Sequence, residues 1–136
     1  MNIVVDTNVL ISALIRNSTT RKIIIESDCK FYYPETSLHE IRNYKALILD
    51  KSGISEVEYD ELFNRLLKYV TLITDEQIRP KLKDAEMEFA RVDPDDVVFL
   101  AAALTIDNCM IWSEDKDFEK QNRIKILKTR DVLKLL

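Results

Sequence analysis

Short apolar runs alternate along this chain with longer stretches in which apolar residues recur every three or four positions. The first run, Ile3–Val5, is wholly β-branched, which is typical of a strand buried on both faces in a parallel sheet. Small polar residues at positions 6–8 end the run, and apolar residues at helical spacing follow. The pattern therefore predicts a buried strand that leads into a helix from about Asn8 to Ile15.

The same alternation continues to the end of the sequence. It predicts strands at 30–33, 71–73, 109–112 and 125–127. It predicts helices around 23–25, at about 36–50, around 62–70, from 74 to about 91, from 97 to about 106, and from a cap at Thr129 onward. Alternating strands and helices favour a three-layer α/β/α fold with a central, mostly parallel, five-stranded sheet. We expect one domain over residues 1–136.

Three local signals place helix ends. Gly53, the only glycine, is expected in the left-handed conformation after a helix. Ser55 and Glu58 have the spacing of a capping box at the start of the next helix. Asp93 followed by Pro94 indicates a helix N-cap with proline at the first helical position.

Composition limits the class of protein. A length of 136 residues with 46% hydrophobic content is enough for one buried core. No apolar run approaches the ~20 residues needed to cross a bilayer, and no export signal is visible, so we expect a cytoplasmic protein without membrane contact. Two cysteines do not make a disulfide framework.

The net charge of −4 limits how the chain can act on nucleic acid. Proteins that hold nucleic acid mainly through phosphate contacts are normally basic. If this chain acts on nucleic acid, either a local Lys/Arg surface or a metal ion must offset its carboxylates.

Five acids stand out by their position in the predicted fold. Asp6 ends the first strand, and Glu40 lies near the start of the helix after the second strand. Asp96 lies in the first turn of a strongly apolar helix, and Asp115 and Asp117 follow the strand at 109–112. Strand C-termini and the following helix N-termini meet at one edge of a parallel sheet, so we expect these acids to gather there.

Clustered carboxylates favour one kind of chemistry. Like charges a few ångströms apart destabilise the fold unless a cation holds them. Oxygen ligands without Cys or His suit Mg²⁺ or Mn²⁺ rather than zinc. A divalent ion can bind a phosphodiester oxygen and lower the pKa of a water, which are the requirements of phosphate ester hydrolysis.

Most of these acids also have an ordinary structural interpretation. Glu40 stands three residues after Ser37, which fits a capping box equally well. The helix dipole explains Asp96, and a solvated loop explains Asp115 and Asp117. The strand-ending aspartate is harder to explain in this way, because its neighbours could cap the helix without it.

Four segments together resemble the PIN domain family, the metal-dependent ribonuclease fold found in the toxin halves of bacterial and archaeal toxin–antitoxin pairs. Any one of them is unremarkable, but their order and spacing are specific, and the resemblance covers nearly the whole length. The segments are Val5-Asp-Thr-Asn-Val-Leu-Ile-Ser-Ala-Leu14, Ser37-Leu-His-Glu-Ile41, Asp93-Pro-Asp-Asp-Val-Val-Phe-Leu-Ala-Ala-Ala103 and Ile111-Trp-Ser-Glu-Asp-Lys-Asp-Phe118.

The resemblance implies a set of site residues. The catalytic acids of the family fall on Asp6, Glu40, Asp96 and Asp115, and the metal ligands on Asp6, Asp96 and Asp115, with Asp117 as an auxiliary acid. Asp96 is preferred to Asp95 because its distance to Ala101 and Ala103 suits the family's pattern. Thr7, Asn8 and Ser113 correspond to groups that orient the acids or water.

The resemblance also implies an activity and partners. It implies Mg²⁺- or Mn²⁺-dependent endonuclease action on RNA that leaves a 5′-phosphate and a 3′-hydroxyl. It further implies a small antitoxin protein as inhibitor, and a homodimer. The alternative is a catalytically inactive PIN-like domain with a nucleic-acid-binding or regulatory role. Metal-independent RNA binding without turnover would favour this alternative. Residues 54–91 hold two helices beyond the most compact toxins, which bears on the substrate path and on partner docking.

Overall fold

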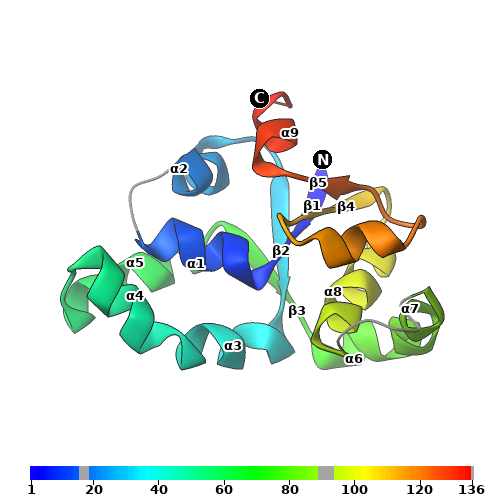
Figure 1. Ribbon diagram of the computed structural model, residues 1–136, viewed down its shortest axis with the longest axis horizontal. Helices are drawn as coiled ribbons and strands as arrows, with labels where there is room; N and C mark the ends of the chain where they lie inside the picture. Colours follow the sequence, from blue (N-terminus) through cyan, green and yellow to red (C-terminus); the bar gives the residue numbers. More distant parts are fainter. Residues whose placement is uncertain (16–18, 89–93, 136) are drawn as a thin grey trace.

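A five-stranded, wholly parallel sheet lies at the centre of the computed structural model, which describes residues 1–15, 19–88 and 94–135 (Figure 1). The strand order is β3-β2-β1-β4-β5. The predicted α/β fold with five strands is therefore confirmed. The strands are β1 (Asn2–Val5), β2 (Lys30–Pro34), β3 (Val70–Ile73), β4 (Cys109–Trp112) and β5 (Ile126–Leu127).

The strand order places a topological switch point between β1 and β4. From β1 the chain moves outward through β2 to β3, then crosses back to β4 and continues to β5. Asn2 pairs with Lys30 of β2 on one side and with Cys109 of β4 on the other, and Val5 pairs with Trp112. In open α/β sheets, ligands bind in the crevice outside the strand C-termini at such a point.

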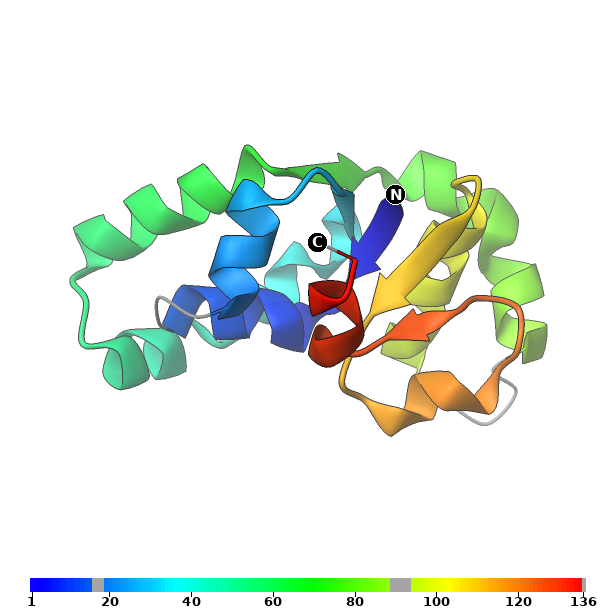
Figure 2. The same ribbon diagram turned by 90° about the horizontal axis from the view of Figure 1, so that it is seen from above.

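Helices cover both faces of the sheet (Figures 1 and 2). On one face, α8 (Pro94–Leu104) contacts β1, β2 and β4, with α6 (Asp75–Ile78), η2 (Arg79–Lys81) and α7 (Leu82–Glu88) beside it. On the other face lie α1 (Thr7–Ile15), α2 (Thr19–Glu26) and α9 (Thr129–Leu133).

The remaining helices connect β2 to β3. They are η1 (Glu35–Ser37), α3 (Leu38–Asn43), α4 (Lys45–Ser52) and α5 (Glu56–Leu67). In both ribbon views α4 and α5 extend to the side of α1, away from the strands. The short helix η3 (Lys116–Lys120) connects β4 to β5.

The core lies on both faces of the sheet, against α8 on one side and against α1 and α2 on the other. Ile3, Val4 and Val5 are fully buried, which explains the unbroken β-branched run of β1. Three consecutive alanines of α8, at 101–103, are also fully buried, and their small side chains let the helix approach the strands closely. The residues on either side of the carboxyl edge are therefore held by a rigid, packed layer.

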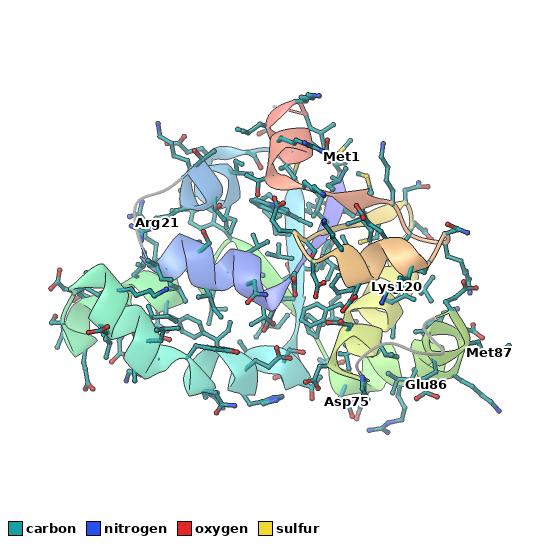
Figure 3. The ribbon with its side chains drawn as sticks, viewed as in Figure 1. Met1, Arg21, Asp75, Glu86, Met87 and Lys120 are labelled. Carbon is teal, nitrogen blue, oxygen red and sulfur yellow. The ribbon has the colours of Figure 1, made fainter. Side chains whose placement is uncertain are left out.

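Arg21 fastens α2 to α1. It is labelled in Figure 3 near the C-terminal end of α1, where its Nε donates to the Ala13 carbonyl oxygen at 2.7 Å. A cation at a helix C-terminus satisfies carbonyl groups that have no partner within the helix.

The long helix predicted at 36–50 is wrong in one respect, because two helices meet at Tyr44. Tyr44 has φ −96° and ψ 4°, and its N–H bonds to the Ile41 carbonyl at 3.0 Å in a tighter turn. The break leaves both Ile41 and Ile48 fully buried. No Pro or Gly marks this position, so the local sequence gave no sign of it.

The helix predicted from Thr74 is also interrupted. Pro80 lies in η2, between α6 and α7. The helix is interrupted there because proline has no N–H for the helical hydrogen bond. The described part of α7 ends at Glu88, and the predicted end near Arg91 falls outside the described residues.

Several predicted helix ends are confirmed and one is wrong. Gly53 has φ 71° after α4, and Ser55 forms the capping box with Glu58 at the start of α5. Thr129 is not the cap of α9 but its first residue, because Lys128 keeps the extended conformation before the helix. The predicted N-cap Asp93 lies outside the described residues.

No helix within the described ranges is long and apolar enough to cross a membrane.

Candidate metal centre

Asp6 lies where β1 ends, at the carboxyl edge of the sheet. Its side chain is almost fully buried, and its N–H donates to the Trp112 carbonyl oxygen at 3.0 Å. This bond continues the pairing of β1 with β4 by one residue. The carboxylate is thus fixed at the switch point.

One hydroxyl orients two of the predicted acids. Ser113 is fully buried, and its Oγ donates to Asp6 Oδ2 at 2.8 Å. The same Oγ accepts the N–H of Asp115 at 3.0 Å. Ser113 therefore fixes the backbone that carries Asp115 relative to the carboxylate of Asp6, as expected of a group that orients the acids.

Three carboxylates from two elements come together beside Asp6. One oxygen each of Asp96, Asp115 and Asp117 lies within 4.8 Å of the others, and all three residues are half-buried. Asp96 comes from the first turn of α8, and the other two come from the segment after β4. The Asp117 N–H donates to Asp115 Oδ1 at 2.9 Å, and Asp117 Oδ1 lies 3.1 Å from Lys120 Nζ.

Contacts between buried aromatic rings fix the elements that carry Asp96 and Asp117. Phe99, one turn after Asp96, contacts Tyr33 edge-on with ring centroids 5.7 Å apart. It also meets Phe118, which directly follows Asp117, at 6.3 Å and an angle of 88°. Edge-to-face pairs of this kind stabilise by about 1 kcal/mol beyond burial. They fix α8 and η3 relative to β2, and with them the two acids.

Glu40 does not form the capping box that its spacing permits. Ser37 is the residue before α3, but its side chain caps nothing. The Glu40 carboxyl is instead hydrogen-bonded to the hydroxyl of Thr7, the first residue of α1. The ordinary helix-end interpretation of Glu40 is therefore wrong.

Thr7 connects Glu40 to a buried tyrosine. Its Oγ1 lies 2.7 Å from the Tyr33 hydroxyl oxygen, which in turn donates to the Ser37 carbonyl oxygen at 2.9 Å. The Thr7 hydroxyl therefore lies between the Tyr33 hydroxyl and the Glu40 carboxyl, and its hydrogen bond to Glu40 lowers the pKa of that carboxyl.

Burial and neighbouring charge raise the pKa of two acids. For Asp6 the largest effect is burial, which raises its pKa; the Ser113 hydrogen bond lowers it, and the charge of Asp115 raises it. Burial also raises the pKa of Glu40, the Thr7 hydrogen bond lowers it, and the charges of Asp95 and Asp6 raise it. These acids therefore hold a proton more readily than ordinary carboxyls do.

The described structure thus brings the predicted acids to one edge. Asp96, Asp115 and Asp117 form one group, which includes neither Asp6 nor Glu40. The charge of Asp115 acts on Asp6, and the charges of Asp95 and Asp6 act on Glu40. Asn8 is exposed on the first turn of α1. Asp95, the alternative to Asp96, is exposed and is not part of the group.

Sequence reasoning missed Tyr33. The aromatic run 30–33 predicted a strand, and nothing in its pattern distinguished the residue whose hydroxyl reaches Thr7. The one available signal was its position near the end of β2, shortly before the helix that carries Glu40.

The donor set fits a hard divalent cation. The grouped ligand atoms are carboxylate oxygens from three aspartates, and no Cys or His belongs to the group among the described residues. Such oxygens suit Mg²⁺ or Mn²⁺. A cation there would also neutralise carboxylates whose mutual repulsion is otherwise unfavourable.

A parallel α/β sheet with an acidic group at its carboxyl edge defines a class of metal-binding α/β proteins. Within that class, the sequence profile described as PIN domain matches residues 4–135, so the chain belongs to the PIN domain family. PIN domains are generally metal-dependent nucleases. The resemblance seen in the sequence is confirmed.

A solved structure described as a toxin–antitoxin complex from Klebsiella pneumoniae has a similar fold. The similarity covers 93% of this chain and 97% of that one, with a TM-score of 0.67 and 13% sequence identity. At that identity the comparison shows the fold alone. No match was found among curated proteins.

Proposed function

We propose that this chain is a Mg²⁺- or Mn²⁺-dependent endoribonuclease, with Asp6, Asp96 and Asp115 as the metal ligands and Asp117 as an auxiliary acid. The observation that carries the proposal is the approach of three aspartate oxygens to within 4.8 Å of one another at the carboxyl edge of a PIN domain. Carboxylates gathered in this way are costly without a cation.

A bound divalent ion supplies Lewis acidity, a more acidic water and alignment of the phosphate. The chain's own residues do the rest. Ser113 holds the carboxylate of Asp6, and the Tyr33–Phe99–Phe118 contacts hold the helices that carry Asp96 and Asp117. Fixed positions matter because electrostatic stabilisation requires groups that do not rearrange during the reaction.

Glu40 handles the proton in this mechanism. It accepts a proton from the attacking water, which forms a bond to phosphorus as the bond to the 3′ oxygen breaks, and the leaving 3′ oxygen takes up a proton from a solvent water. The products are a 5′-phosphate and a 3′-hydroxyl. A general base works best with a pKa near the working pH, and burial moves the pKa of Glu40 in that direction.

The proposal extends to partners. The similarity in fold to a chain of a toxin–antitoxin complex supports a small antitoxin as inhibitor. A homodimer and a cytoplasmic location belong to the same proposal and stay predictions. Size-exclusion chromatography with light scattering tests the dimer, for which a mass of about twice 15.9 kDa is expected.

Cleavage of labelled RNA tests the activity directly. We expect 5′-phosphorylated products with Mg²⁺ or Mn²⁺, none with a chelator, and none from Asp6→Asn in either condition. Full cleavage in the chelator would contradict the metal-dependent mechanism. RNA binding without any turnover would favour the inactive, nucleic-acid-binding alternative.

A further inference from the structure

A polar pocket opens next to the group formed by Asp96, Asp115 and Asp117. Its volume is about 290 Å³, and the side chains that carry its chemistry are those of Asn8, Ser12, Thr20, Glu114, Asp115 and Thr129. We propose that this pocket binds the nucleoside adjoining the bond to be cleaved and selects ribose over deoxyribose. The proposal rests on the proposed function, and it names the sugar that the site prefers.

The pocket lies at the switch point of the sheet. Asn8 and Ser12 are one turn apart on α1, which follows β1, whereas Glu114 and Asp115 follow β4. Asp115 belongs both to this pocket and to the group formed with Asp96 and Asp117. A molecule in the pocket therefore lies directly beside the place where a phosphate would react.

The lining excludes a phosphate and favours a sugar. One amide, three hydroxyls and two carboxylates face the pocket, and no Lys or Arg is among the described residues that line it. The carboxylates of Glu114 and Asp115 repel a phosphate but accept hydrogen bonds from sugar hydroxyls. The ligand class is thus an uncharged, hydroxyl-rich group such as a nucleoside.

The size of the pocket sets a limit on the occupant. About 290 Å³ is at the lower end of small-ligand pockets, which run from about 300 to 1,000 Å³. One nucleoside fits, whereas a base pair does not. The occupant is therefore an unpaired nucleotide, as is usual where RNA is recognised in single-stranded regions.

Ribose and deoxyribose differ by one hydroxyl. A site whose polar groups are built to bond a substrate hydroxyl discriminates strongly against the analogue without it, because those groups then lose their partner. Glu114 is exposed, and its Oε1 accepts the N–H of Thr129 at 2.8 Å, which fixes the carboxylate at the pocket wall. A fixed acceptor is suited to the 2′-hydroxyl, which distinguishes RNA from DNA.

The chain contains its own reporter for this pocket. Trp112 is the only tryptophan, and its Nε1–H donates to Thr129 Oγ1 at 3.0 Å. Its indole N–H signal in a ¹H–¹⁵N NMR spectrum therefore senses a ligand that contacts Thr129. This measurement needs neither cleavage nor a metal ion.

The experiment titrates the metal-free chain with adenosine, cytidine, guanosine and uridine, and with their 2′-deoxy forms. We expect at least one ribonucleoside to shift the Trp112 indole signal saturably, and its 2′-deoxy form to bind about tenfold more weakly or not at all. Ser12→Leu, which fills the pocket from α1, should abolish the shift. Ser52→Leu on α4, outside the pocket, is the matched control and should leave the shift unchanged.

A second variant keeps the test informative if Ser12→Leu fails to fold. Thr20→Val removes a hydroxyl at nearly constant shape, and we expect it to weaken ribonucleoside binding, whereas Thr71→Val on the edge strand β3 should not. Equal shifts by ribo- and deoxyribonucleosides, no saturable shift by any ribonucleoside, or no effect of the variants that fold, would overturn the inference. Ribonucleoside binding without RNA cleavage would instead contradict the proposed function alone.

Discussion

The Ser113 hydroxyl donates a 2.8 Å hydrogen bond to the carboxylate of Asp6, a residue 107 positions away in the sequence. Because the same oxygen accepts the Asp115 N–H, the ends of β1 and β4 are joined through a single buried atom. In the proposed site, this atom fixes two of the metal ligands relative to one another.

Ser113→Ala should therefore weaken metal binding. Groups that orient a metal ligand commonly change metal affinity by about 10- to 100-fold when removed, and the loss of this bond also raises the pKa of Asp6 further. Mn²⁺ titration followed by electron paramagnetic resonance measures the affinity. Ser52→Ala is the control, and equal affinity in both variants would show that the bond does not support the site.

The stability of the metal-free chain should depend on the ionisation of Asp6. Burial raises its pKa above the usual 3.8, so the charged form is destabilising in the folded state and this penalty is complete at neutral pH. As the pH falls through the raised pKa toward 3.8, the penalty disappears. Asp6→Asn should thus raise the unfolding temperature at pH 7 in a chelator, and the gain should shrink on acidification.

Thermal unfolding from pH 7 to pH 4 measures this effect. Asp50→Asn, at an exposed position of α4, is the matched control and should show no such pH-dependent gain. A lower unfolding temperature for Asp6→Asn at pH 7 would contradict the assigned cause.

Asp95 and Asp96 are adjacent in α8 but should differ in function. Asp96 lies in the three-aspartate group and Asp95 is exposed. Asp96→Asn should reduce RNA cleavage by about 100-fold or more, because a lost ligand removes several kcal/mol of charge stabilisation, at about 1.4 kcal/mol per tenfold. Asp95→Asn should stay within about threefold of the parent rate in the same assay. Equal losses of cleavage rate in Asp95→Asn and Asp96→Asn would contradict the assignment of Asp96, and not Asp95, to the metal site.

Tyr33 should act as a positioning residue for Glu40. Tyr33→Phe keeps the ring that contacts Phe99 but removes the hydroxyl between Thr7 and the Ser37 carbonyl. We expect kcat to fall by about tenfold at nearly constant KM, with a displaced pH profile, and stability to fall by about 1–3 kcal/mol.

Tyr32→Phe supplies the control on the same strand, since its hydroxyl makes a long 3.5 Å bond to Asn2 away from the site. A pH profile of Tyr33→Phe that matches the parent's would leave Tyr33 with a structural role only.

Local pattern was enough to predict the sheet and the position of the acids. The β-branched run of β1 and the polar residues after it mark a strand C-terminus. Asp6 and Asp115 follow strand C-termini, whereas Glu40 and Asp96 lie in the first turns of helices. Parallel topology alone then brings Asp6, Asp96 and Asp115 to one edge. Predicting this arrangement requires no knowledge of contacts between side chains distant in the sequence.

Contacts between segments distant in the sequence could not be predicted from local patterns. Ser37 and Glu40 have capping spacing, yet Glu40 is bonded to Thr7, more than thirty positions away. The break at Tyr44 likewise reflects packing of both Ile41 and Ile48 rather than a local breaker residue. Tertiary packing decided these cases against local propensity.

The most direct test of the central claim is a crystal soaked with Mn²⁺ and measured by anomalous scattering. We expect one strong peak within bonding distance, about 2.0–2.4 Å, of carboxylate oxygens from Asp6, Asp96 and Asp115 or of waters that they hold. A peak bound elsewhere, or none in a crystal of chain that cleaves RNA, would contradict it.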